Sequence, residues 1–236
     1  FVDKDTRVLS YQPSYTQVNT FITTNTDKYI KVNILDPLGD HVYNFNLCAG
    51  VDVVYLVNPN NPTGKLLEVD KIEELVRTYP DVLFIVDEAY YEFAKTSCCH
   101  LVVSHKNLIV TRTFSKAFGL ASVRLGYCMG HPDTLEHLKK IRNGKAVNTL
   151  AQLCGIAALD DLDYLDSRIR EMNDAKKFFI DNLPHQYNAV DSQTNFILLK
   201  TPDSEKLLNR MKDNKILIRD RSSFDNLQNC VRITIG

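Results

Sequence analysis

The chain has 236 residues, a formal net charge of -1, 44% hydrophobic residues and 24% charged residues. These values are typical of a globular protein that buries one main core and has room for a smaller second unit. No apolar run approaches the ~20 residues that a membrane-spanning helix needs, so no membrane partner is expected. The near-neutral charge also argues against nucleic acid, because no summed positive field could hold a phosphate backbone.

The six cysteines are scattered and show no Cys-x-x-Cys spacing, and the first residues do not resemble a signal peptide. We therefore predict free thiols in a cytoplasmic protein. Cys98, Cys99 and His100 are adjacent, but further ligands at matched spacing are missing, so the sequence predicts no metal site. Because the chain opens at Phe1 without an initiator methionine, we expect the natural protein to continue upstream.

Residues 51–126 show the alternation of strands and helices that is typical of a parallel sheet. Residues 51–57, 82–86 and 107–114 are predicted strands, and the apolar spacing within 67–79 predicts a helix. Parallel strands bring the residues after their carboxyl ends to one edge of the sheet, where α/β folds bind ligands. The residues expected to converge there are Asn61, Asp87, Tyr90 and Lys116.

The second half of the chain has a different composition. Helix-spaced apolar residues fill 133–141 and roughly 150–183, and Pro184 marks a stop. Short strands are predicted over 194–200, 216–220 and 229–236, with a helix over 204–212. The predicted fold class is therefore α/β, with a mostly parallel large domain over residues 1–143 and a smaller α+β domain over residues 144–236.

Three polar residues stand where a pyridoxal phosphate enzyme would need them. Such an enzyme needs a lysine for the cofactor aldehyde, an acid for the pyridine nitrogen, and contacts that fix the ring and the phosphate. Lys116 lies on a loop after a strand, Asp87 ends a buried strand, and Tyr90 follows three residues later. A carboxylate at Asp87 would favour the charged form of a ring nitrogen.

Four motifs in the expected order, NPNNPTG, DEAYYEF, RTFSKAFGLASVRLGY and VRITIG, resemble those of fold-type I pyridoxal phosphate aminotransferases. The resemblance is to the histidinol-phosphate aminotransferase group in particular, and it extends over residues 11–236. It implies pyridoxal 5'-phosphate as the cofactor, the fold-type I architecture, and a homodimer with active sites at the subunit interface.

The resemblance also implies roles for individual residues. Lys116 would be the catalytic residue, which holds the cofactor as a Schiff base and carries the proton between the substrate and the cofactor. Asp87 would bind the pyridinium nitrogen, while Asn61 and Tyr90 would hydrogen-bond the ring oxygen. Tyr15 would stack on the ring.

Further residues match the groups that bind anions in this family. The cofactor phosphate would be held by Thr113, Ser115 and Arg124. Arg124 would reach this phosphate by a charge-assisted contact. Arg232 would receive an anionic group of the substrate, and Arg219 or Arg221 would bind a substrate phosphate. Without the resemblance, Arg219 and Arg221 would equally suit an ordinary charged surface.

This sequence departs from the family pattern in two places. The small-residue stretch that holds the cofactor phosphate upstream of QPSY, and the tyrosine lent to the neighbouring subunit, are not in this sequence. Residues 142–148, RNGKAVN, stand where the family commonly has a Pro-Tyr/Phe-Asn-Val run. The second departure bears on the substrate, because it weakens the case for an imidazole compound.

The favoured reaction is amino transfer between a glutamate-like donor and a small phosphorylated acceptor. Two alternatives stay open: a decarboxylase of an O-phospho amino acid with the same cofactor, and a non-catalytic binding module. A nucleotide-hydrolysing fold is disfavoured, because TGKL at 63–66 lacks both the upstream glycine and the Ser/Thr after Lys65.

Overall fold

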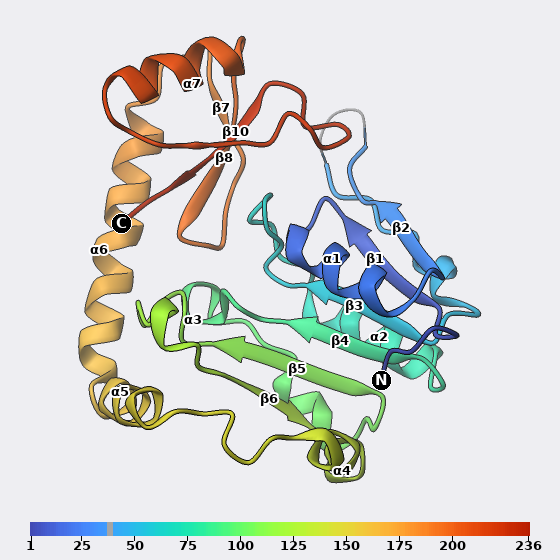
Figure 1. Ribbon diagram of the computed structural model, residues 1–236. Coiled ribbons are helices and arrows are strands. Elements are labelled where there is room, and N and C mark those ends of the chain that lie inside the picture. The colour runs from blue at the N-terminus through green and yellow to red at the C-terminus, as the bar shows by residue number, and fades with distance from the viewer. Residues whose placement is uncertain (37–39) are drawn as a thin grey trace.

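A six-stranded sheet forms the larger part of the protein, for which the computed structural model describes residues 1–36 and 40–236. The strand order is β2-β1-β3-β4-β5-β6, and every neighbouring pair is parallel except β5 with β6 (Figure 1). The bounds are β1 Val8–Gln12, β2 Tyr29–Asn33, β3 Val53–Val57, β4 Leu83–Asp87, β5 Leu108–Thr113 and β6 Gly126–Gly130. The predicted mostly parallel α/β class is confirmed.

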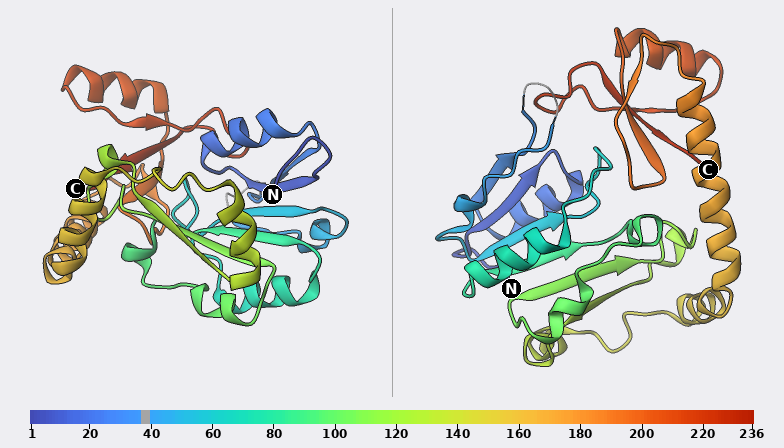
Figure 2. Two further views of the ribbon diagram at one scale, coloured as in Figure 1. Left: turned by 60° about the horizontal axis from the view of Figure 1, so that its bottom comes forward. Right: turned by 180° about the vertical axis from the view of Figure 1, so that it is seen from behind.

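Helices cover both faces of this sheet. α1 (Thr16–Asn25) lies on one face and α2 (Val69–Thr78) on the other (Figures 1 and 2). Side chains of β3 alternate between two cores, so that Val53 packs with the α1 residues Val18 and Ile22, and Val54 belongs to the core that contains Ile72 of α2. Burial on both faces explains why β3 reads as an uninterrupted apolar run.

Further helical elements accompany the large sheet as far as residue 141. They are α3 (Tyr91–Ala94), α4 (Pro132–Ile141) and 3-10 helices at Phe45–Cys48, Cys99–Val103 and Ala121–Val123. Within the described part of the chain, no helix combines the length and the apolar character needed to span a bilayer.

A second, four-stranded antiparallel sheet has the order β7-β8-β10-β9. Its strands are β7 Asn188–Ala189, β8 Phe196–Lys200, β9 Arg219–Asp220 and β10 Cys230–Thr234, and α7 (Ser204–Asp213) lies beside them. α6 (Leu162–Asp181) runs along one side of the molecule from the region of the large sheet to this smaller one (Figure 1). The boundary between residues 143 and 144 stays a prediction.

The helical stretch expected over 150–183 is divided at Asp161. α5 (Thr149–Asp160) ends there, and the Asp161 side chain accepts a hydrogen bond from the backbone N–H of Tyr164 at 3.2 Å, which caps α6. An aspartate at this position satisfies a helix amide that otherwise has no partner. Apolar spacing alone continues through the break, so it does not reveal the cap.

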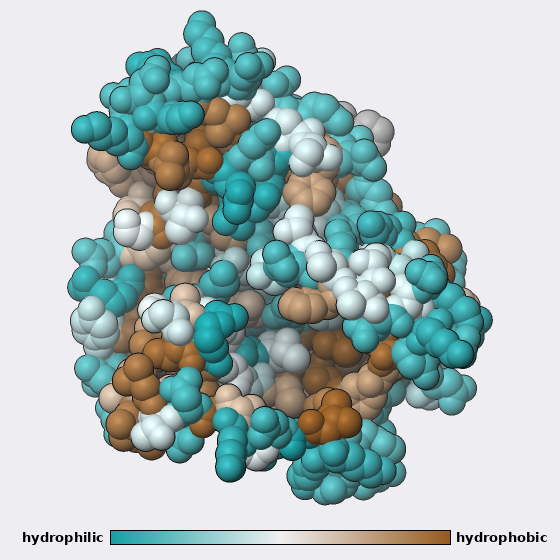
Figure 3. All heavy atoms as spheres, in the orientation of Figure 1, coloured by the Kyte–Doolittle hydropathy of each residue, from teal (hydrophilic) through white to brown (hydrophobic). Residues whose placement is uncertain are grey.

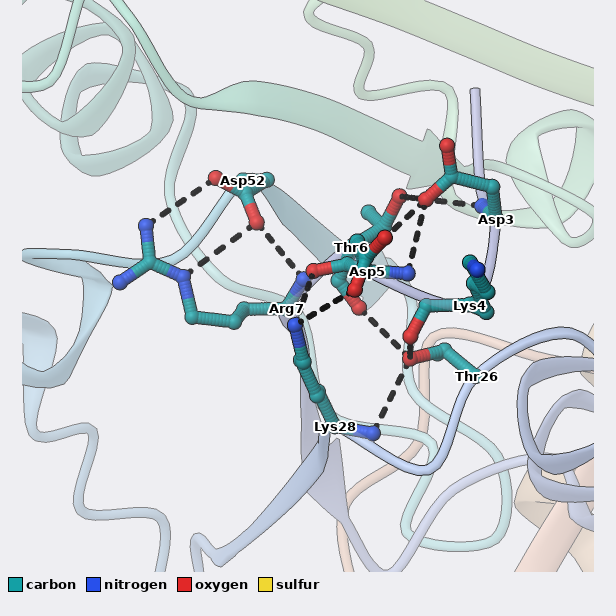
Figure 4. Close-up of polar contacts among 8 residues, drawn as sticks. All are labelled: Asp3, Lys4, Asp5, Thr6, Arg7, Thr26, Lys28 and Asp52. Carbon is teal, nitrogen blue, oxygen red and sulfur yellow. Dashed lines mark hydrogen bonds and ion pairs between the residues drawn. The ribbon is translucent and has the colours of Figure 1, made fainter.

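A polar network joins the amino-terminal ends of β1, β2 and β3 (Figure 4). The Asp52 carboxylate accepts hydrogen bonds from the backbone N–H of Arg7 at 2.7 Å and from its guanidinium at 3.2 and 3.3 Å. The Thr26 hydroxyl donates to the carbonyl of Thr6 at 2.8 Å and accepts from the backbone N–H of Lys28 at 3.0 Å. These contacts, exposed at Asp52 and part-buried at Thr26, fix the strand starts at the end of the sheet opposite to the carboxyl edge.

The NPNNPTG loop after β3 is held by buried polar groups. The Asn60 amide donates to the carbonyl of Pro13 and to the hydroxyl of Thr63, both at 3.0 Å. His41 Nε2 lies 2.9 Å from the Thr63 hydroxyl, and His41 Nδ1 lies 3.3 Å from the Tyr43 hydroxyl. The loop that supports the carboxyl edge is therefore braced by an imidazole.

This imidazole predicts a pH dependence of stability. Burial, reinforced by Lys65, lowers the pKa of His41 from 6.5 to about 4. The unfolded chain therefore binds more protons between these values, and the free energy of unfolding falls as pH falls from 6.5 to 4, by up to about 3 kcal/mol for this group. Urea unfolding of the wild type and of His41→Gln across this range measures the difference. If the free energy of unfolding changed with pH in the same way in both proteins, His41 would not be the source of the pH dependence.

Candidate active site

The carboxyl edge of the large sheet opens into a cavity of about 360 Å³. Its lining includes all eight residues that the sequence predicts for the cofactor: Tyr15, Asn61, Asp87, Tyr90, Thr113, Ser115, Lys116 and Arg124. A neighbouring cavity of about 660 Å³ shares Tyr15, Asn61 and Lys116 with the first. The predicted substrate residues line this second cavity: Arg219, Arg221 and Arg232. The structure therefore brings every predicted site residue to one place.

Asp87 is part of the lining of the first cavity. It is the last residue of β4, and the sheet register places it beside Val57 of β3 and Thr111 of β5. One carboxylate oxygen accepts from the backbone N–H of Ala89 at 3.0 Å, and the other accepts from the Tyr55 hydroxyl at 2.5 Å. Desolvation raises the pKa of Asp87, and these two hydrogen bonds oppose that rise because they favour the charged form.

Lys116 follows β5 on a turn in which Gly119 adopts a positive φ of 68°. Its ammonium lies 5.6 Å from the centre of the Tyr90 ring. Partial burial and the positive charge of Arg232 lower the pKa of Lys116, and the Asp87 carboxylate acts in the opposite direction. A lowered pKa increases the fraction of neutral, nucleophilic amine at neutral pH. Tyr90 is buried, which raises its pKa to about 12 and keeps it a hydrogen-bond donor.

Asn61 connects the two cavities. Its side-chain oxygen accepts a hydrogen bond from an Arg232 Nη at 2.8 Å, which leaves the amide NH₂ available as a donor toward the first cavity. The Arg232 guanidinium lies 5.0 Å from the centre of the Phe196 ring. Arg232 Nε is buried and has no hydrogen-bond partner among the described residues. A buried cationic donor without a partner is costly unless a ligand satisfies it.

The end of β5 and the residues that follow it contribute to the lining of the first cavity. The Thr113 hydroxyl accepts from the backbone N–H of Ser115 at 3.0 Å, which turns the chain at the strand end. Arg124 has a left-handed backbone with φ 59°, and one Nη donates to the carbonyl of Ala121 at 2.8 Å. Two hydroxyl-bearing residues, Thr113 and Ser115, and the arginine Arg124 therefore line one cavity, a combination that suits an anion.

Three residues at or beside the cavity are not predicted from the sequence. Tyr55 contacts Asp87 directly, and Thr111 and Arg112 are part of the lining. For Tyr55 the one available signal was a lone hydroxyl within the aliphatic run VVYLV. The strand register that aims it at Asp87 is set by pairing with a distant segment.

A buried ion pair braces the strand ends beside the cavity. An Arg112 Nη lies 2.9 Å from the Glu88 carboxylate, and the guanidinium lies 3.3 Å from the centre of the Tyr91 ring. Glu88 also accepts from the backbone N–H of Cys98 at 2.8 Å and from the Ser97 hydroxyl. Cys98, which the sequence marked as part of a Cys-Cys-His cluster, therefore belongs to a structural network.

The arrangement fits pyridoxal phosphate. The lining of the cavity combines a carboxylate, an amine, and hydroxyl-bearing residues with an arginine. These are the three kinds of group that the ring nitrogen, the aldehyde and the phosphate of this cofactor need. The unpartnered Arg232 Nε beside the cavity offers a further contact to an anionic substrate.

The sequence model of the aminotransferase class I and II family matches residues 1–236, and the chain belongs to this family. Within it, the chain lies close to the histidinol-phosphate aminotransferase group, as the motifs predict. A dihydroxyacetone phosphate transaminase of Campylobacter jejuni is 42% identical over 191 residues, which is 79% of this chain and 52% of that protein. A histidinol-phosphate aminotransferase of Methanococcoides burtonii is 38% identical over 193 residues, or 80% of this chain and 53% of that protein.

Solved structures show the same fold. The histidinol-phosphate aminotransferase of Sinorhizobium meliloti, in complex with pyridoxal-5'-phosphate, has a TM-score of 0.85 at 26% identity and covers 100% of this chain and 67% of that one. The L-threonine-O-3-phosphate decarboxylase of Porphyromonas gingivalis has a TM-score of 0.81 at 26% identity, with coverage of 98% and 72%. The family and the cofactor-bound neighbour support pyridoxal phosphate as the cofactor. The chain spans about half the length of the curated relatives it matches.

Proposed function

We propose that the protein is a pyridoxal phosphate-dependent aminotransferase that moves an amino group between a glutamate-like donor and a small phosphorylated acceptor. The observation that carries this proposal is the meeting of Lys116, Asp87 and Arg232 around two adjoining cavities. The family supports the reaction class. The names of the relatives, a dihydroxyacetone phosphate transaminase and a histidinol-phosphate aminotransferase, support a phosphorylated substrate.

Each residue has a proposed task that follows from its position. When bound, the cofactor supplies an electrophilic aldehyde and an electron-withdrawing ring. Asp87 would keep a carboxylate against the ring nitrogen, and the Asn61 NH₂ and Tyr90 hydroxyl would donate toward the ring oxygen. Tyr15 would stack on the ring. Lys116 would hold the aldehyde through its neutral amine, and its Nζ would carry protons.

Anionic groups have separate binding places in the proposal. The cofactor phosphate is held by Thr113, Ser115 and Arg124. Arg232, oriented by Asn61, receives the substrate carboxylate, or the equivalent anionic group of the acceptor. Arg219 and Arg221 line the same second cavity, where they would bind the substrate phosphate.

Mutual repulsion among the arginines supports a dianionic ligand. Burial lowers the pKa of Arg221 to about 10, and the charges of Arg232 and Arg219 add to this effect. Arg221 Nε is buried without a hydrogen-bond partner among the described residues. A phosphate would satisfy this donor and neutralise the excess positive charge, so the site is built for an anion.

Arg221→Gln should raise the KM of the phosphorylated substrate about 10- to 100-fold, the effect of losing one hydrogen bond to a charged group. The KM of the amino donor should stay unchanged, because glutamate does not reach Arg221. Steady-state kinetics with each substrate varied in turn measures both constants. Arg210→Gln, on the exposed face of α7, is the matched control. An equal rise in both KM values would contradict a phosphate contact.

The experiment that tests the proposed function detects where the cofactor binds and which form it has after one turnover. The protein is loaded with pyridoxal phosphate, reduced with borohydride and digested, and the labelled residue should be Lys116. A single turnover with glutamate should leave pyridoxamine phosphate on the enzyme. Absence of any cofactor label would refute the proposal.

Decarboxylation of an O-phospho amino acid is the second candidate. The similarity of this fold to that of the threonine-phosphate decarboxylase, with a TM-score of 0.81, supports this candidate reaction. The same single-turnover experiment separates the two reactions, because decarboxylation releases carbon dioxide and returns the pyridoxal form. No observation among the described residues favours the non-catalytic binding module.

We further propose a cytoplasmic homodimer. The six cysteines are free, which supports a reducing compartment such as the cytoplasm.

The exposed surface of α5 supports the dimer. Leu150, Leu153 and Ile156 on this helix are 62%, 61% and 59% exposed, and Figure 3 shows hydrophobic residues gathered at this corner of the molecule. Contiguous apolar surface of this kind supports a protein contact. Light scattering after size exclusion measures the mass.

A further inference from the structure

The Tyr55 hydroxyl reaches Asp87 because of the register between two neighbouring strands. Val57 of β3 pairs with Asp87 of β4, and Tyr55 pairs with Ile85. Tyr55 is two residues before Val57, so the two side chains share one face of the sheet. Because Val57 pairs with Asp87, Tyr55 and Asp87 are diagonal neighbours on that face. A tyrosine side chain is long enough to span this diagonal. The resulting hydrogen bond to Asp87 Oδ2 measures 2.5 Å.

Tyr55 supplies one of only two hydrogen bonds that the described residues donate to the Asp87 carboxylate. The other comes from the backbone N–H of Ala89 and ends on Oδ1. Asp87 lines the cavity and is desolvated, so each donor counts toward keeping the carboxylate charged. Burial raises the pKa of Tyr55 well above its ordinary value, with the Asp87 charge adding to the rise. The phenol therefore keeps its proton and acts as a donor at every working pH.

We propose that Tyr55 is a positioning residue that holds Asp87 ionised and oriented, so that the ring nitrogen of the bound cofactor keeps its proton. The inference rests on the proposed function, because it requires pyridoxal phosphate above Asp87. The Tyr55 hydroxyl donates a hydrogen bond that stabilises the ionised form of Asp87 more than its protonated form. Loss of this hydroxyl therefore removes a donor that favours the charged carboxylate. The carboxylate becomes more basic, and the proton shared with the ring nitrogen moves toward Asp87. The ring then withdraws electrons less strongly.

The matched variants are Tyr55→Phe and Tyr11→Phe. Tyr11 lies on β1, next to β3, and is buried. Its hydroxyl lies 3.4 Å from the Asn44 carbonyl and 3.4 Å from Cys48 Sγ, not at Asp87. Both changes delete one buried phenolic oxygen from the same sheet. A general loss of packing or stability would therefore affect the two variants alike.

The first measurement is solid-state NMR of the holoenzyme with pyridoxal phosphate labelled with ¹⁵N in the ring. Wild type and Tyr11→Phe should give the chemical shift of a protonated ring nitrogen. Tyr55→Phe should shift the resonance toward the unprotonated value at the same pH. An identical resonance in Tyr55→Phe and wild type would overturn the inference. This readout does not depend on turnover.

The second measurement compares the binding of pyridoxal phosphate with that of its 1-deaza analogue, in which carbon replaces the ring nitrogen. Tyr55→Phe should weaken pyridoxal phosphate binding about tenfold, the scale of one hydrogen bond to a charged group, and leave the affinity of the analogue within about twofold. Equal weakening of both ligands would overturn the inference and assign Tyr55 a structural role. A wild-type protein that binds neither ligand would instead refute the proposed function, so the two failures are distinguishable.

Discussion

Lys116→Ala should lower the rate of amino transfer by at least about 10³-fold, within the range that one positioned proton-transfer group contributes. The same substitution should abolish the borohydride label. Lys116 lines the first cavity, and burial and Arg232 lower its pKa. Among the described residues it is the lysine that combines this position with a lowered pKa. Single-turnover absorbance with glutamate measures the rate directly.

The control for this prediction is Lys95→Ala. Lys95 pairs with Asp166 at 2.9 Å, and both side chains are about half exposed, so its loss should leave the rate and the label unchanged. A Lys116→Ala enzyme that still carries a stable borohydride label would place the reactive amine elsewhere. The exogenous amine methylamine should partly restore the rate if Lys116 acts as the proton carrier.

The sequence could predict the main site because its residues stand at strand ends. Asp87 closes an apolar run and Lys116 follows another, and parallel strands carry such positions to one edge. The motif resemblance added the residues on loops, such as Arg124, whose left-handed backbone no periodicity reveals. All eight predicted cofactor residues line one cavity, although their individual roles stay proposals.

What the sequence could not predict depends on pairing between distant segments. β1 and β2 have five residues each, which is too short for a clear hydrophobic pattern. Their place in the sheet depends on parallel pairing between segments that are separated in the sequence. β6 runs antiparallel to β5, which places an edge strand where simple alternation predicts none. Tyr55 reads as one more core residue until the β3–β4 register places it against Asp87. Register is a tertiary property, since it is set by the fit of whole faces.

Arg232→Met should lower kcat/KM for both amino donor and acceptor by about 10³-fold, the loss expected for two charge-assisted hydrogen bonds to a carboxylate. The arrangement is specific to arginine. One Nη is held by Asn61 at 2.8 Å, the guanidinium carbon lies 5.0 Å from the centre of the Phe196 ring, and Nε is buried without a partner among the described residues. Arg232→Lys keeps the charge but cannot both contact Asn61 and present a planar pair of donors. It should therefore recover only part of the loss.

Measuring kcat/KM separately for the amino donor and the acceptor distinguishes the role of Arg232 from that of Arg221. Arg221→Gln should affect the phosphorylated substrate alone, whereas Arg232→Met should affect both half-reactions, because each substrate presents an anionic group to the same guanidinium in turn. Binding of pyridoxal phosphate should change less than about threefold in Arg232→Met, since its guanidinium lines the second cavity rather than the first. A variant that loses the cofactor but keeps its substrate constants would show that Arg232 acts through Asn61 on the ring. Full activity on glutamate in Arg232→Met would move the carboxylate contact to Arg219.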